Sequence, residues 1–166
     1  MIFGNECVLG VHPLSRGFSW ALFEGPDALF DWATASVPRG DNARATDRVC
    51  ALLGKYQPRA LVVEEFEDPV SRRQARVREL YRMILVRAED HGIVVHRCSR
   101  HAMARALAVQ GAFTRKAMAD AVALRVKALG PLVPNQRKIW ESEHPRMAVF
   151  SAAACVLAYY ASQTSS

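Results

Sequence analysis

The chain has 166 residues, 51% of them hydrophobic and 23% charged, with a formal net charge of +6. This length suits one domain over residues 1–166 with a core of its own, and the composition excludes a disordered tail. The positive charge favours a polyanionic partner. We find no apolar run long enough for a membrane span and no signal-peptide pattern, so we expect a cytoplasmic protein.

The four cysteines do not form a recognisable metal or redox motif. They are Cys7, Cys50, Cys98 and Cys155, without C-x-x-C spacing and each inside an apolar segment. This pattern predicts reduced thiols buried in the core.

The first third of the chain predicts three short strands. Residues 7–11 form an apolar run that His12 and Pro13 end, and residues 16–24 alternate in polarity. A Gly-Pro-Asp turn at 25–27 leads into a third strand at 28–37. Such short connections predict an antiparallel meander.

Helices and two further strands alternate after the meander. Apolar spacing predicts a helix at 42–56, capped by Asp41 or Asn42, and another helix at 71–91. The remaining elements are strands at 59–66 and 93–98, helices at 100–109 and 114–128, and an apolar last helix that opens at Pro145. This order predicts an α/β fold with a mixed five-stranded sheet, three antiparallel strands and then two parallel ones, flanked by helices.

Polar side chains follow the predicted strands where functional groups gather in such sheets. His12 ends the first strand, and Glu64 and Glu65 end the fourth, so one of the two glutamates faces each side of the sheet. Sequence alone does not decide which glutamate faces a site. A solvated glutamate pair and a structural histidine are the alternatives.

The last helix carries a second group of polar residues. Glu143 and His144 precede its first turn, and Ser151 lies seven residues after His144, on nearly the same helical face. Helix capping and a hydroxyl bonded back to a backbone carbonyl are the alternatives to a functional role.

Arginine is concentrated in a few stretches. It outnumbers lysine there, which favours bidentate contact with phosphate over solubility alone, and a solvated basic face is the alternative. The residues that we expect to bind nucleic acid are Arg16, Arg72, Arg73, Arg76, Arg100, Arg115 and Lys116.

With these residues in place, the chain resembles the RuvC-type Holliday junction resolvase branch of the RNase H-like superfamily over nearly its whole length. The resemblance rests on four stretches in order, "VLGVHPLSRGFSWALFE", "LVVEEF", "HRCSRHAMARALAVQGAFTRKAMADAVA" and "HPRMAVFSAAACVLAYY". They resemble the family's first two strands and turn, its glutamate-bearing strand, its Thr-Lys region, and its alanine-rich last helix.

The resemblance implies a metal-dependent nuclease site in which this chain departs from the family. Four acidic positions of the family hold two Mg²⁺ ions for phosphodiester cleavage. They fall here on His12, on Glu64, on Glu143 with His144, and on Ser151, so that only Glu64 keeps the family's residue. The implied metal ligands are Glu64, His12 and His144, with Mg²⁺ or Mn²⁺ as cofactor if the site is active.

Three functions follow as hypotheses. The first is a protein that binds branched or double-stranded DNA and whose cleavage is attenuated or lost because His12 and Ser151 replace acids. The second is an active endonuclease that uses one Mn²⁺ or Zn²⁺ ion, and the third is a protein-interaction module on the same fold. The resemblance also implies a homodimer, with Tyr81, Met83 and Leu85 of the 71–91 helix as candidate interface residues.

Overall fold

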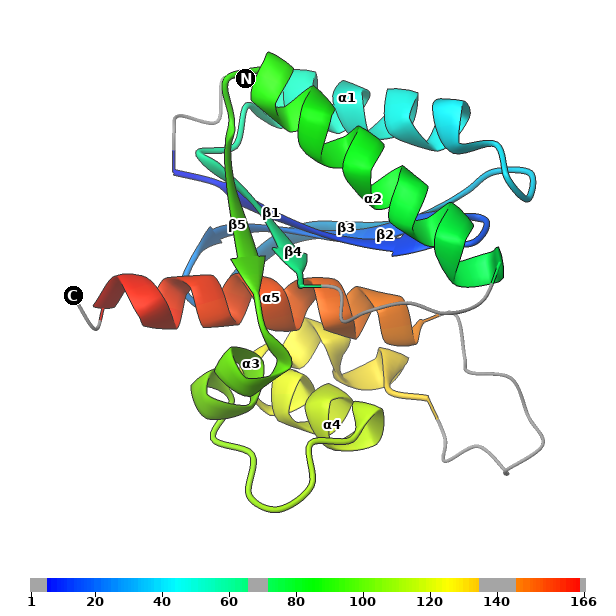
Figure 1. The fold of residues 1–166 in the computed structure, drawn as a ribbon. Helices are drawn as coiled ribbons and strands as arrows, with labels where there is room; N and C mark the ends of the chain where they lie inside the picture. Colours follow the sequence, from blue (N-terminus) through cyan, green and yellow to red (C-terminus); the bar gives the residue numbers. More distant parts are fainter. Residues whose placement is uncertain (1–5, 66–71, 135–145, 165–166) are drawn as a thin grey trace.

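A mixed five-stranded sheet forms the centre of the molecule in the computed structural model, which describes residues 6–65, 72–134 and 146–164. The strands are β1 (Val8–Leu14), β2 (Gly17–Gly25), β3 (Ala28–Ser36), β4 (Ala60–Glu64) and β5 (Val94–Cys98). Their order across the sheet is β3-β2-β1-β4-β5, with β1 to β3 antiparallel and β4 and β5 parallel to β1. The predicted fold class is confirmed (Figure 1).

β1 is longer than the sequence predicted, because His12 and Pro13 belong to the strand. His12 pairs with Ser19 and Pro13 with Phe18 of β2. Pairing with β4 on the other side reaches only from Val8 to Val11. Beyond Val11, β1 therefore has a partner on one side only, and a proline without an N–H group is tolerated there.

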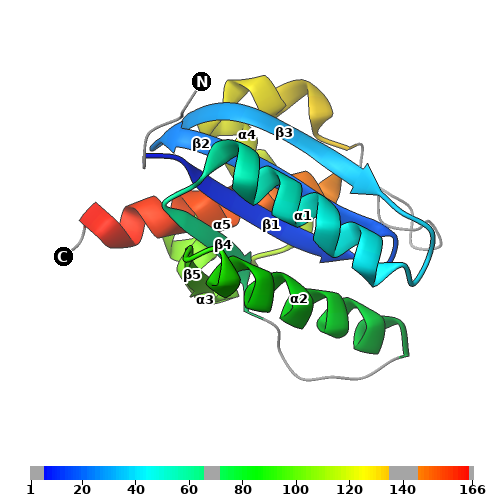
Figure 2. The ribbon, with the colours of Figure 1, turned by 90° about the horizontal axis from the view of Figure 1, so that it is seen from above.

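Two helices cover one face of the sheet. They are α1 (Asn42–Tyr56) and α2 (Arg72–Asp90), which lie side by side in Figure 2. Asp41 caps α1 as predicted, since its carboxylate accepts a hydrogen bond of 3.1 Å from the Arg44 backbone N–H. The core on this side includes Leu9, Val11, Leu53 and Ile84.

The opposite face is covered by α5 (Met147–Thr164), with α3 (Arg100–Ala106), α4 (Arg115–Arg125) and the 3₁₀ helix η1 (Lys127–Leu132) outside it. α3 ends three residues earlier than predicted, and α4 begins one residue later and ends three residues earlier than predicted. Ala108 and Gly111 take positive φ angles of 53° and 81° after α3. After α4 the chain forms the 3₁₀ helix η1, which contains Pro131. An α-helix would not accommodate this proline in its interior.

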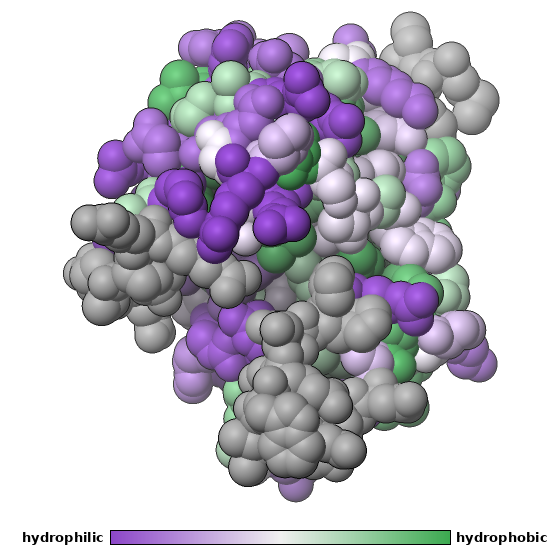
Figure 3. Space-filling view, turned by 90° about the vertical axis from the view of Figure 1, so that its right-hand side faces the viewer, coloured by the Kyte–Doolittle hydropathy of each residue, from purple (hydrophilic) through white to green (hydrophobic). Residues whose placement is uncertain are grey.

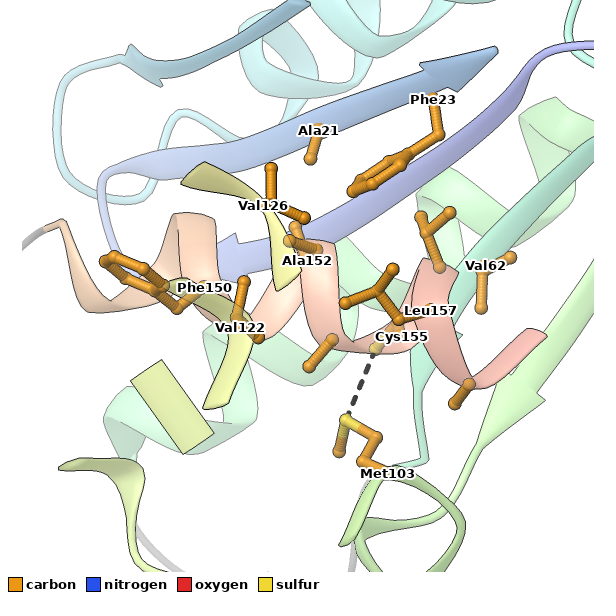
Figure 4. Packing of buried hydrophobic residues seen from close by; sticks show 14 of the residues in the cluster. Ala21, Phe23, Val62, Met103, Val122, Val126, Phe150, Ala152, Cys155 and Leu157 are labelled. Atoms are coloured by element: carbon orange, nitrogen blue, oxygen red, sulfur yellow. Dashed lines mark hydrogen bonds between the residues drawn. The ribbon is translucent and has the colours of Figure 1, made fainter. Parts of the chain in front are cut away.

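α5 packs directly against β1, and every residue from Met147 to Tyr159 is buried. At Gly10 a Cβ atom would overlap the carbonyl oxygen of Ala152 and lie 2.7 Å from Cγ2 of Val156, so only glycine allows this close approach. Figure 4 shows the packing of Ala152 and its neighbours below β2. α5 has the length and hydropathy of a membrane span, but its burial in the core accounts for its apolar composition.

The prediction of buried free thiols is confirmed for three of the four cysteines and wrong in burial for Cys50. All four are free thiols, and Cys7, Cys98 and Cys155 are buried, whereas Cys50 on α1 is half-buried.

Candidate functional site

A row of polar side chains crosses the sheet on the face that α5 covers. The strand register aligns Thr34 with Ser19, Ser19 with His12, and Glu64 with Cys98. Because Val11 pairs with Val63, His12 and Glu64 are next to each other in neighbouring strands. Side chains alternate along a strand, so His12 and Glu64 point to the same face as Gly10 and Val62, the face that α5 covers. Glu64 therefore faces the site, whereas Glu65 is exposed just after the end of β4.

His12 and Glu64 make the central contact of this row. Nδ1 of His12 lies 3.7 Å from Oε2 of Glu64, and the two side chains are only 16% and 17% exposed. Burial, with a smaller effect of the Arg115 charge, lowers the pKa of His12 to about 4. His12 is therefore neutral at pH 7, the contact is no ion pair, and its buried Nδ1 has no hydrogen-bond partner.

Arg100 supplies a positive charge to the same carboxylate. Its Nη1 lies 3.6 Å from Oε1 of Glu64, the oxygen that His12 does not approach. Its Nη2 donates a 2.8 Å hydrogen bond to the Phe113 carbonyl oxygen, and the guanidinium lies 5.2 Å from the centre of the Phe113 ring. These contacts hold Arg100, the first residue of α3, between β4 and the loop before α4.

Arg115 brings a second guanidinium to the site. It is the first residue of α4, directly after Thr114, whose hydroxyl caps the helix by accepting from the Ala117 N–H at 3.0 Å. Its charge acts on His12. The neighbouring Lys116 is oriented differently, because its Nζ pairs with Asp120 at 2.8 Å within α4.

Ser151 lies on the buried side of α5. Its hydroxyl is 1% exposed and donates a long hydrogen bond of 3.5 Å to the Met147 carbonyl oxygen one turn earlier. Ala152, the next residue, lies beneath Gly10. β1 and α5 run in opposite directions in Figure 1, so His12 lies nearer the start of α5 than Gly10 does.

The described residues of this site do not by themselves supply the oxygen ligands that a pair of Mg²⁺ ions needs. Hard divalent cations need several oxygen ligands, and Glu64 is the one carboxylate that the described part of the chain brings to the row. No group of three His, Cys, Asp or Glu side chains within residues 6–65, 72–134 and 146–164 is arranged to hold a metal ion. Glu143 and His144 lie outside the described residues.

The structure does not connect the other predicted nucleic-acid-binding residues that it describes with the His12–Glu64 contact. Arg16, between β1 and β2, and Arg76, on α2, are exposed. Figure 3 shows the side of the molecule where α1, α2 and α5 begin, and hydrophilic side chains gather on its upper part. The side chains of Arg72 and Arg73 lie outside the described residues.

Sequence reasoning missed a sulfur cluster beside Glu64. Sγ of Cys155 donates to Sδ of Met103 at 3.8 Å (Figure 4), and Cys155 is hydrogen-bonded to Cys98, the strand partner of Glu64. This bond and burial hold the pKa of Cys155 well above its usual range, so it stays a thiol. Only the register of β4 and β5 brings these residues together, and no spacing in the sequence indicates it.

No protein-family model and no curated protein match the chain. Solved structures do match. Thermus thermophilus RuvC is 19% identical with a TM-score of 0.71 over 96% of each chain, and a T. thermophilus RuvC in complex with Holliday junction substrate is 19% identical with a TM-score of 0.67 over 95% of each. The yeast mitochondrial Holliday junction resolvase is 13% identical with a TM-score of 0.56, over 99% of this chain and 85% of that one. These likenesses confirm the predicted RuvC-type RNase H-like fold.

Proposed function

We propose that this protein binds branched DNA at the carboxyl ends of β1 and β4 and that its phosphodiester cleavage is attenuated or lost. The observation that carries the proposal is the composition of the site. One carboxylate, Glu64, is shared between a neutral imidazole and the guanidinium of Arg100, with Arg115 close by. A phosphodiester backbone suits such a site better than two metal ions do, because guanidinium groups donate to phosphate oxygens.

The fold supports the same proposal from another direction. One of its structural neighbours is a RuvC in complex with Holliday junction substrate, aligned over 95% of this chain. Exposed basic residues such as Arg16 and Arg76 would make sequence-independent backbone contacts in addition. Function does not follow from fold alone, so the residues of the site have to carry the assignment.

Binding across a salt series tests this proposal. A labelled four-way junction and a linear duplex of the same arm sequence are titrated with protein, and fluorescence anisotropy reports the affinity. We expect tighter binding to the junction and a plot of log K against log salt with a slope of about −4 or steeper, since each neutralised phosphate contributes about −0.9. A flat plot would reject DNA binding and favour a protein-interaction module.

A single-metal endonuclease is the second candidate function. The observation that favours it is the unpartnered Nδ1 of His12, which faces Oε2 of Glu64 across 3.7 Å. Imidazole nitrogen and carboxylate oxygen together suit Mn²⁺ or Zn²⁺. Cleavage of labelled junction in Mn²⁺ or Zn²⁺ that is abolished in Glu64→Gln would establish this function, and intact strands with every metal would reject it.

A homodimer is part of the proposal. Of the three predicted interface residues, Leu85 is buried in the core of the protomer, whereas Tyr81 and Met83 are half-buried. Val86, also on α2, is 55% exposed and extends this surface. Light scattering coupled to gel filtration is expected to give twice the chain mass for the wild type, and a monomer for Val86→Lys if α2 forms the interface.

A further inference from the structure

Arg100 places a positive charge beside the Glu64 carboxylate. Its Nη1 lies 3.6 Å from Oε1 of Glu64, and the orientation of the guanidinium is set by two other contacts, a 2.8 Å hydrogen bond to the Phe113 carbonyl oxygen and the face of the Phe113 ring. A side chain restrained on two sides is preorganised, so its charge stays at the carboxylate without further ordering.

The same guanidinium retains capacity for a ligand. Arginine has five N–H donors, and the contacts with Phe113 and Glu64 use one donor each. The side chain is 37% exposed, so its outer edge reaches solvent. A planar guanidinium that presents two parallel N–H groups matches the oxygens of a phosphodiester.

A second guanidinium is linked to the first through the chain. Phe113, which Arg100 holds, is followed by the cap residue Thr114 and then by Arg115. The loop that Arg100 fixes thus carries Arg115 to the same edge of the sheet, where the charge of Arg115 acts on His12. Arg100 and Arg115 thus bring two permanent positive charges to this edge of the sheet, and guanidinium groups suit an anionic ligand.

We infer that Arg100 takes the place of a divalent cation, so that this site binds the phosphodiester backbone without a metal ion and excludes divalent metals from Glu64. The inference rests on the proposed function and deepens it, since it states how the phosphate is held. It follows from the disagreement between the residues present and a two-metal site. The fold does not require a metal for binding if a guanidinium supplies the charge.

The first test compares the affinity of the wild-type protein for the four-way junction in EDTA and in millimolar Mg²⁺, at matched ionic strength. We expect equal affinities. Binding that needs Mg²⁺ would overturn the inference and leave the proposed DNA binding intact. Absence of binding in both buffers would contradict the proposed function instead.

The second test uses Arg100→Ala with Arg105→Ala as the matched control, because Arg105 is an exposed arginine in the last turn of the same helix. In EDTA we expect Arg100→Ala to weaken junction binding by about tenfold or more, as expected for the loss of a charge-assisted contact, and Arg105→Ala to change it much less. In Mg²⁺ the affinity of Arg100→Ala should recover in part. Equal effects of the two variants would contradict the role of Arg100.

The third test does not depend on DNA. Mn²⁺ is titrated into the free protein and followed by its electron paramagnetic resonance signal, with circular dichroism to confirm that each variant is folded. We expect no binding to the wild type or to Arg100→Lys, which keeps the positive charge, and measurable binding to Arg100→Ala that Glu64→Gln removes. Binding of Mn²⁺ to the wild type through Glu64 would overturn the inference by itself.

Discussion

Nδ1 of His12 and Oε2 of Glu64 lie 3.7 Å apart without forming an ion pair, because burial keeps the imidazole neutral. Glu64 directs its other oxygen, Oε1, toward Arg100. The carboxylate therefore pairs with a permanent charge on α3 and not with the titratable group on β1. Glu64 therefore has a permanent positive charge beside it. The buried, neutral imidazole of His12 makes the folded protein sensitive to acid.

We predict that acid destabilises the protein through His12. The native pKa of about 4 lies below the usual value of 6.5, so the unfolded chain binds a proton first as the pH falls. The contribution of His12 to the free energy of unfolding is therefore fully present above about pH 6.5. It decreases as the pH falls toward 4, and about 2 kcal/mol of it is lost at about pH 5. Urea unfolding at about pH 7.5 and about pH 5 measures this loss.

The control is His12→Gln, which cannot titrate in this range. Glu64, Arg100 and Arg115 are unchanged in this variant, so their contributions to the pH dependence remain. The wild type should lose about 2 kcal/mol more than His12→Gln between the two pH values. Equal losses would show that His12 is not held neutral in the native state.

Gly10→Ala should destabilise the fold by about 3 kcal/mol, a large value for overpacking. The added methyl would overlap the Ala152 carbonyl oxygen and crowd Val156. Neither the backbone of α5 nor that of β1 moves easily to make room. Gly54→Ala is the matched control, because that glycine on α1 has no atom near its Cβ position and alanine favours the helix. Thermal unfolding should show a lower midpoint for Gly10→Ala and an equal or higher one for Gly54→Ala.

Ser151→Ala should leave junction binding unchanged and alter the free energy of unfolding by no more than about 1 kcal/mol. The hydroxyl makes one long bond of 3.5 Å to a carbonyl that already belongs to the helix, so little is lost with it. Anisotropy with the junction and urea unfolding check the two parts. A loss of DNA affinity in a folded variant would assign Ser151 to the site after all.

His12→Asp combined with Arg100→Ala should raise the affinity for Mn²⁺ above that of Arg100→Ala alone. The first change places a carboxylate beside Glu64, and the second removes the competing guanidinium. Mn²⁺ titration of the single and double variants measures the effect, with the double variant expected to bind most tightly. An unchanged affinity in the double variant would mean that the spacing of β1 and β4 does not suit a metal.

The sequence predicted the order and type of the described strands and α-helices because their apolar patterns are regular, but it did not predict the 3₁₀ helix η1. Its errors lie where tertiary context decides. Residues 12–14 of β1 were missed because a histidine and a proline ordinarily end a strand, whereas β2 continues the pairing on one side here. α3 was predicted too long because the positive φ angle of Ala108 has no signature in its own residue type. α4 was predicted too long because the chain leaves the α-helix before the 3₁₀ helix η1.

The candidate site could be predicted only in part. Alternation at a strand end narrowed the choice to Glu64 or Glu65, and the pairing with β1 decided it. Arg100 was predicted as a nucleic-acid-binding residue, but its contact with Glu64 was not. That contact depends on the direction that α3 takes after β5, which no local sequence pattern specifies. The sulfur cluster of Cys98, Met103 and Cys155 joins three elements and was equally hidden.

The most direct test of the account follows binding and strand integrity in one sample, with labelled four-way junction, excess protein and Mg²⁺ or Mn²⁺. The account predicts a high anisotropy, equal to that in EDTA, and full-length strands on a denaturing gel after long incubation. Strands cut near the branch point by the wild type and left intact by Glu64→Gln would contradict it, because a working metal site would then exist where we place a resident guanidinium.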